Sequence, residues 1–137
     1  MRVFVFLFSV LLGIASCSSG MPAFQELHRR WSVIKVEGID GYSIKYNDID
    51  LSPTMTNANQ YSGYIASSKI IFTAIFGKGH HFEIKNIILV RNDESRHTEI
   101  STFIKELAIM NYYTLKDNIL IFSNNQMHKK IEMKAMN

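Results

Sequence analysis

The stretch Lys69-Ile-Ile-Phe-Thr-Ala-Ile-Phe76, followed by Gly77-Lys78-Gly79, decides the fold, because it predicts a strand and the turn that reverses it. β-Branched and aromatic residues dominate the run, as is typical of strands. Glycine readily adopts the positive φ that tight hairpin loops require. We therefore expect residues 80–84 to return antiparallel, and residues 86–90 to form a further apolar strand.

Working outward from this hairpin, comparable runs predict most of the remaining sheet. They lie at residues 31–36, 42–46, 48–51, 61–66, 112–115, 119–122 and 127–133, with turns at 116–118 and 124–125 and a short leading helix over 24–30. Residues 129, 130 and 134 are lysines, which favours a solvated edge strand at the end of the chain.

The apolar period changes once, between residues 90 and 112. Apolar side chains recur there at helical spacing and form one stripe: Ile100, Phe103, Ile104, Leu107 and Ala108. This predicts one main helix at about 95–110, with Asn92, Asp93 or Ser95 as its cap. Strands, one helix and more strands indicate an α+β fold, a curved, mainly antiparallel and partly barrel-like sheet with the helix packed against it.

Three of the predicted strands are apolar at every position, namely residues 70–72, 87–90 and 119–122. A strand of this kind is expected to be covered on both faces. The helix is expected to cover one face, and curling of the sheet the other.

The first seventeen residues resemble a bacterial lipoprotein signal. Arg2 precedes an apolar run over residues 3–14 and small residues follow, which is the layout of a secretory signal peptide. The run is shorter than the roughly 20 residues of a membrane-spanning helix. Ile14-Ala15-Ser16-Cys17 resembles the lipobox and contains the only cysteine. An ordinary signal peptide with a chance cysteine is the alternative.

The lipobox resemblance implies that residues 1–16 are removed and that Cys17 is lipidated. Several acyl chains anchor a protein stably, whereas one binds marginally. Residues 17–29 then form a lipid-anchored spacer, and residues 30–137 form one domain. Ser18 stands where an aspartate often retains such lipoproteins at the inner membrane, which favours the outer membrane.

Composition excludes some classes of function. The formal net charge of +3 is too small to indicate a nucleic-acid partner. With Cys17 committed to lipid, no disulfide within the chain is expected. The sequence contains no Gly-x-Ser-x-Gly elbow, phosphate-binding glycine loop or His-Glu-x-x-His helix, so we predict no catalytic residue, no cofactor and no enzymatic activity.

The order of the predicted elements resembles the META domain of HslJ-like lipoproteins of the bacterial envelope. The family's Trp-led strand is matched by residues 31–36 and Gly38. Its central motif, a glycine, two residues and Gly-Cys-Asn, is matched by Gly63 and by residues 66–68, here Ala-Ser-Ser. Residues 90–94 stand in place of its Thr-x-Met-Ala-Cys pattern.

The second half of the resemblance covers the helix and the last strands. The family's helix residues are matched by Glu99, Phe103 and Leu107, and its final tyrosine, turn and Leu-x-Leu strand by Tyr113, residues 117–118 and residues 120–122. Both signature cysteines are absent, so a function that depends on them is not implied. The resemblance implies a non-enzymatic envelope protein, sometimes linked to stress responses.

A weak candidate contact surface follows the hairpin turn, at His80, His81 and Glu83. Imidazole and carboxylate suit zinc, but no third ligand is apparent, and we predict no metal site. Residues 91–99 are rich in charge, which favours a solvated helix-capping loop, with a second contact surface as the alternative. Tyr61, Tyr64, Tyr112 and Tyr113 either line a groove or pack across strands.

Three functions fit these features. The first is a lipid-anchored accessory or stress-related binding protein with an unknown envelope protein partner. The second is a lipocalin-like carrier of a small ligand, which requires a cavity. The third is an inhibitor of an envelope-directed hydrolase, acting through the loop at residues 53–60.

Overall fold

A computed structural model describes residues 24–37, 47–52, 59–92, 95 and 97–136. The signal peptide, Cys17, the strand predicted at 42–46, Gly38 and most of the loop at 53–60 lie outside these residues. The predicted α+β fold, a curved antiparallel sheet with one main helix, is confirmed.

The strands and helices follow one another in a simple order. They are α2 (Phe24–Leu27), β1 (Arg30–Glu37), β2 (Asn47–Asp50), β3 (Gln60–Ile65), β4 (Ser68–Phe76), η1 (Lys78–His80), β5 (Phe82–Arg91), α3 (His97–Ile109), β6 (Tyr112–Lys116), β7 (Ile119–Asn124) and β8 (Lys129–Ala135).

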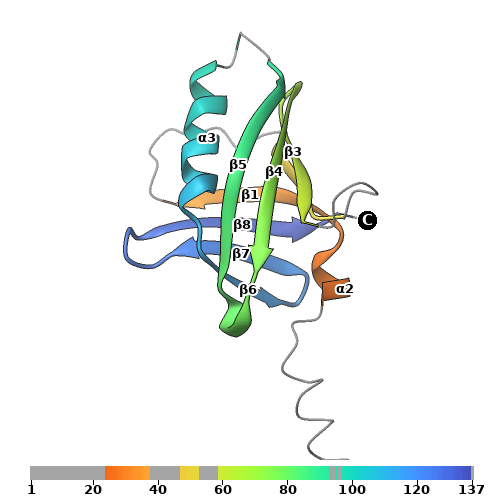
Figure 1. Ribbon diagram of the computed structural model, residues 1–137, viewed down its shortest axis with the longest axis vertical. Helices are drawn as coiled ribbons and strands as arrows, with labels where there is room; N and C mark the ends of the chain where they lie inside the picture. The colour runs from red at the N-terminus through yellow and green to blue at the C-terminus, as the bar shows by residue number, and fades with distance from the viewer. Residues whose placement is uncertain (1–23, 38–46, 53–58, 93–94, 96, 137) are drawn as a thin grey trace, which may run out of the picture.

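All eight strands belong to one sheet, in the order β5-β4-β3-β2-β1-β8-β7-β6, and every neighbouring pair is antiparallel. β1 pairs with β8, so the two ends of the described chain meet in the middle of the sheet. In Figure 1 the sheet curls until β3, β4 and β5 run across β1, β8, β7 and β6. The prediction that β8 is an edge strand is wrong, because β8 lies between β1 and β7.

Side chains from both halves of the sheet fill its concave side. Buried aromatic residues form a chain of ring contacts, in which Phe82 lies 4.6 Å from Phe122 and Phe76 lies 5.5 Å from both Phe82 and Tyr113 (centroid to centroid). Aliphatic residues complete this core. Burying such rings is the largest source of stability available to a domain of this size without disulfides.

α3 packs its apolar stripe against this core. Ile100, Phe103 and Leu107 are 1% exposed or less, as the helical spacing predicts. Of the other predicted members of the stripe, Ile104 is partly buried, and Ala108 is exposed, so its prediction is wrong. The helix runs beside β5 (Figure 1), at the free edge of that strand. Of the predicted cap residues, Asp93 lies outside the described part. None of the described helices has the length and apolar character needed to span a bilayer.

β5 differs from the prediction in two ways. Residues 80–84 and 86–90 form one continuous strand that begins at Phe82, and His80 belongs to the preceding 3₁₀ turn. Gly79 and His80 both have positive φ, at 68° and 66°, which places His80 before the strand. Asn86, at φ 53°, lies where the pairing with β4 shifts register, so one residue is bulged out there.

Candidate functional site

The sheet comes close to closing where β5 begins. His81 forms an isolated antiparallel bridge with Tyr112, and the Phe82 amide donates to the Asn111 carbonyl at 3.1 Å. The ring of His80 stacks on Tyr113 at 5.0 Å with 8° between the planes, and its Nδ1 lies 3.1 Å from the Tyr113 carbonyl oxygen. We call His80, His81, Tyr112 and Tyr113 the seam.

The contacts within the seam are structural. The His81 ring meets Tyr112 edge to face at 5.4 Å and the His80 ring stacks on Tyr112 at 6.1 Å, so all four rings of the seam are linked by ring contacts. Tyr113 is 2% exposed and its hydroxyl has no hydrogen-bond partner within the described part of the chain. Burial raises the pKa of Tyr113 above its ordinary value of 10.0.

Glu83 does not join the two histidines at a common site. Its carboxylate forms an ion pair with Lys85 at 3.7 Å on the exposed surface of β5. Among the residues that the structure describes, no group of three or more His, Cys, Asp or Glu side chains is placed to hold a metal ion.

The four tyrosines do not line one groove. Tyr61 and Tyr113 are buried in the core, whereas Tyr64 and Tyr112 are partly exposed on different parts of the sheet. Tyr64 lies under two cations, with the Arg30 guanidinium carbon and the Lys69 ammonium nitrogen each 5.8 Å from its ring centroid. The tyrosines therefore pack across strands. Of the charge-dense stretch at 91–99, Arg91 donates to the Ser67 carbonyl at 2.7 Å.

The outer surface of β4 and β5 is unexpectedly apolar. Ile70 faces the core and pairs with Leu89, which is 37% exposed on the edge strand, and the adjacent pair of Ile71 and Ile88 faces outward. Ile88 is 56% exposed and Ile75, two pairs further along β4, is 45% exposed. Here we name Ile71, Ile75 and Ile88 the apolar face. The prediction that residues 87–90 are covered on both faces is wrong, because the sheet does not curl over this side.

Polar and charged residues lie beside and within the apolar face. Lys69 pairs with Arg91 at one end, the outward pair of Thr73 and Lys85 lies between Ile75 and the other two isoleucines, and Ile75 pairs with Glu83. Glu83 is the acidic residue among these outward positions of β4 and β5, and it is already paired with Lys85. Exposed apolar side chains with a polar rim are typical of protein interaction surfaces.

Two surface pockets lie elsewhere. One, of about 260 Å³, lies beside the seam and is lined by His81, Asn111, Tyr112 and residues 124–126. The second, of about 350 Å³, lies between α2 and the β6–β7 turn, and is lined by Glu26, Arg29, Trp31 and residues 115–118. We call the second one the tether pocket, because α2 is where the described chain begins.

Sequence reasoning missed both the apolar face and the tether pocket. The pocket combines residues 26–31 with residues 115–118, which are distant in the sequence, and no motif connects them. The apolar face had a visible signal, an isoleucine-rich run in β5, but the pattern alone does not say which side remains uncovered.

No protein-family model matches the chain, and no curated protein matches it in sequence. Among solved structures, the chain is similar to the crystal structure of a DUF4847 family protein from Bacteroides vulgatus, with a TM-score of 0.56 and 15% sequence identity. The similarity covers 78% of this chain and 92% of that chain. At this identity, the likeness shows a shared fold only.

Proposed function

We propose that the protein is a lipid-anchored, non-enzymatic binding protein of the bacterial envelope that acts through its outer surface. The observation that carries the proposal is the apolar face, where Ile75 and Ile88 are about half exposed while the concave side is filled by rings. Exposing isoleucine to water forfeits burial that is worth roughly 1.5–3 kcal/mol for each side chain, so a surface of this kind suits a partner that covers it.

The rim of the apolar face indicates the chemistry of that partner. Lys69, Lys85 and Arg91 outnumber Glu83, so a protein with an apolar centre and acidic rim residues would complement this surface. The anchor rests on the lipobox-like residues 14–17, and the META-like identity rests on the order of elements, with one helix before three final strands. These are parts of the proposal.

The filled interior argues against the alternative of a lipocalin-like carrier. The buried aromatic residues occupy the space in which a carrier would hold its ligand. The tether pocket has the volume of a small-ligand site, but four of the seven described residues that line it are charged, and it lies between α2 and the β6–β7 turn. Of the loop proposed for an inhibitor, only residues 59 and 60 are described.

Site-specific crosslinking tests the proposal in a bacterial host that makes the full chain. Ile88 is replaced by a photo-crosslinking amino acid in one variant, and Thr114, an exposed residue facing outward on β6, in a control. We expect a discrete protein adduct from position 88 and none from position 114. Reversing the rim charge with Lys85→Glu should lower the yield at least about fivefold, because the expected partner is acidic.

Two outcomes would contradict the proposal. Equal adducts from both positions would show that the apolar face is not selective, and an adduct that is indifferent to Lys85→Glu would exclude the acidic partner. The same host tests the anchor. Cys17→Ser should release the protein from the membrane fraction and abolish its lipid labelling. Retention with unchanged lipid labelling would refute the anchor alone.

A further inference from the structure

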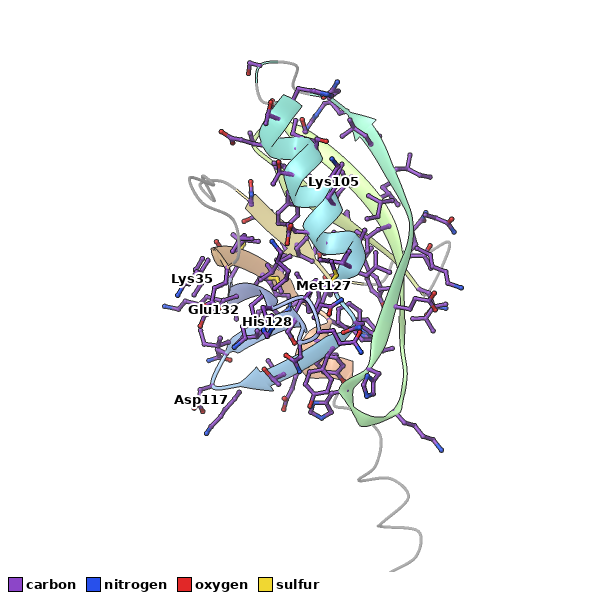
Figure 2. The ribbon with its side chains drawn as sticks, turned by 90° about the vertical axis from the view of Figure 1, so that its left-hand side faces the viewer. Lys35, Lys105, Asp117, Met127, His128 and Glu132 are labelled. Carbon is purple, nitrogen blue, oxygen red and sulfur yellow. The ribbon has the colours of Figure 1, made fainter. Side chains whose placement is uncertain are left out.

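The tether pocket lies where the described chain begins. Glu26 belongs to α2, and residues 115–118 form the hairpin between β6 and β7 on the opposite wall. Figure 2 shows Asp117 at the outer tip of this hairpin, away from α3. The pocket is therefore formed by two surface elements that meet beside the entry of the chain.

Its inner wall is held in place by specific contacts. The Trp31 indole Nε1 donates to the Leu27 carbonyl at 3.0 Å, and the ring is 1% exposed. The Arg29 guanidinium lies 5.7 Å over that ring and donates through Nη2 to the Met136 carbonyl at 3.2 Å. A guanidinium has five N–H donors, so Arg29 keeps donors for a ligand while its position is fixed.

The opposite wall is a tight turn. Asp117 and Asn118 have φ values of 53° and 63°, the left-handed pair expected of a two-residue hairpin turn. The Ala135 amide donates to the Asn118 carbonyl at 3.0 Å, which fixes the turn on β8. Lys116 and Asp117 therefore present their charges from a constrained backbone.

The charges around the pocket are mixed and not neutralised by one another. Arg29 and Lys116 are cations, and Glu26 and Asp117 are carboxylates. Within the described residues, none of these four forms an ion pair. Cations of this kind bind phosphate oxygens and carboxylates bind ammonium groups through charge-assisted hydrogen bonds. The pocket thus suits a small ligand that carries both charges.

The proposed anchor identifies such a ligand. Residues 18–23 separate Cys17 from α2, and an extended chain of that length reaches at most about 25 Å. A lipidated Cys17 would therefore keep the tether pocket close to the phospholipid headgroups. A phosphoethanolamine headgroup has an anionic phosphodiester and a primary ammonium, which match the two kinds of charge in the pocket.

We propose that the tether pocket binds the phosphoethanolamine headgroup of membrane phospholipids, which orients the domain on the bilayer that anchors it. The claim that the headgroup comes from the bilayer rests on the proposed function. The claim that the pocket binds the headgroup through its charges does not. The two can therefore fail separately.

Trp31 allows a direct test, because it is the only tryptophan in the sequence and it lines the pocket. The purified full chain is titrated with glycerophosphoethanolamine while Trp31 emission is recorded. We expect a saturable change, with at least about tenfold weaker binding of glycerophosphoglycerol, which has the phosphodiester only, and of ethanolamine, which has the ammonium only. Glycerophosphocholine, whose quaternary ammonium lacks N–H donors, should also bind at least about tenfold more weakly.

Variants identify the residues responsible. Lys116→Gln and Asp117→Asn should each weaken binding about tenfold, and asparagine tolerates the left-handed backbone at position 117. Lys130→Gln removes an exposed lysine on β8 that does not line the pocket, and should leave binding unchanged. Thermal unfolding of each variant checks that the fold persists. No saturable change, or equal binding of all four probes, would overturn the proposal.

Vesicles then distinguish the source of the headgroup. The lipidated chain is reconstituted into vesicles with phosphatidylethanolamine or with phosphatidylcholine only, each carrying a trace of lipid with a nitroxide headgroup. Stronger quenching of Trp31 in the first vesicles supports a bilayer ligand. Binding of the free headgroup without this difference would overturn the bilayer as its source, while leaving the anchor itself to the Cys17→Ser result.

Discussion

The two flanks of the sheet present different outer surfaces, although both alternate inward and outward residues. On the flank of β6, β7 and β8, the outward residues of β6 and β8 are polar, such as Thr114 and Lys134, and Ile119 and Ile121 of β7 are half-buried between them. On the flank of β4 and β5, isoleucines face outward instead. Polar outward residues on the first flank are expected of a sheet face in contact with water. The isoleucines on the second flank are the reason why we propose a partner that covers them.

The sharpest test of this difference compares two isoleucines on neighbouring strands. Ile70→Ala removes a side chain that is fully buried in the core, and should lower the free energy of unfolding by about 2–5 kcal/mol. Ile88→Ala truncates a side chain that is 56% exposed, and should change it by no more than about 0.5 kcal/mol. Urea denaturation measures both. Comparable losses would mean that the apolar face is covered in the free protein.

Gly63 of β3 tests how tightly the core is filled beneath that face. A Cβ at this position would lie 3.0 Å from Ile70 Cγ1 and 3.1 Å from Ile49 Cδ1. Gly63→Ala should therefore destabilise the fold by about 1–3 kcal/mol through overpacking. Its neighbour Ser62 pairs with Ile71 and faces outward, so Ser62→Ala is the matched control and should be nearly neutral. Equal effects would indicate space around Gly63.

Substitution of Tyr113 has the smallest expected effect on the free energy of unfolding, and this effect is a gain and not a loss. Its buried hydroxyl lacks a partner among the described residues, so Tyr113→Phe should leave the stability at pH 7 unchanged or raise it by up to about 1 kcal/mol. Burial raises the pKa of Tyr113 in the folded state, so the tyrosine ionises more readily in the unfolded chain. This ionisation does not affect the free energy of unfolding below pH 10, and lowers it as the pH rises further.

The advantage of the phenylalanine variant over the native chain should therefore grow above pH 10, and denaturation at pH 7 and pH 10.5 measures it. Tyr61, whose pKa burial also raises, stays in both proteins and serves as an internal reference. A variant that is less stable at pH 7 would show that the Tyr113 hydroxyl has a partner in solution.

The two flanks also illustrate which features of the fold could be predicted from the sequence and which could not. Local patterns sufficed for α3, whose stripe gave Ile100, Phe103 and Leu107 correctly, and for most strands. They failed where the outcome depends on the tertiary fold. An isoleucine-rich strand indicates burial in general, and only the curl of the sheet decides that Ile88 faces outward.

The candidate site was predicted least well, for the same reason. His81 follows the turn as predicted, but His80 lies within it, and the ring partners Tyr112 and Tyr113 come from β6, beyond the helix. Glu83 instead pairs with Lys85 on the same strand. Contacts between distant segments leave no local pattern in one sequence.

The pairing of β1 with β8 has a consequence for how the chain folds while it is being synthesised. Trp31 pairs with Ala135, so the sheet cannot join its two halves until the chain has been made as far as β8. The hairpins of each half connect neighbouring residues and can form earlier, whereas this junction closes last. A chain that stops before β8 would leave one side of β1 and one side of β7 without a neighbouring strand. Such fragments would expose two adhesive edges at once, which makes premature termination more hazardous here than in a fold whose final strand lies at the rim.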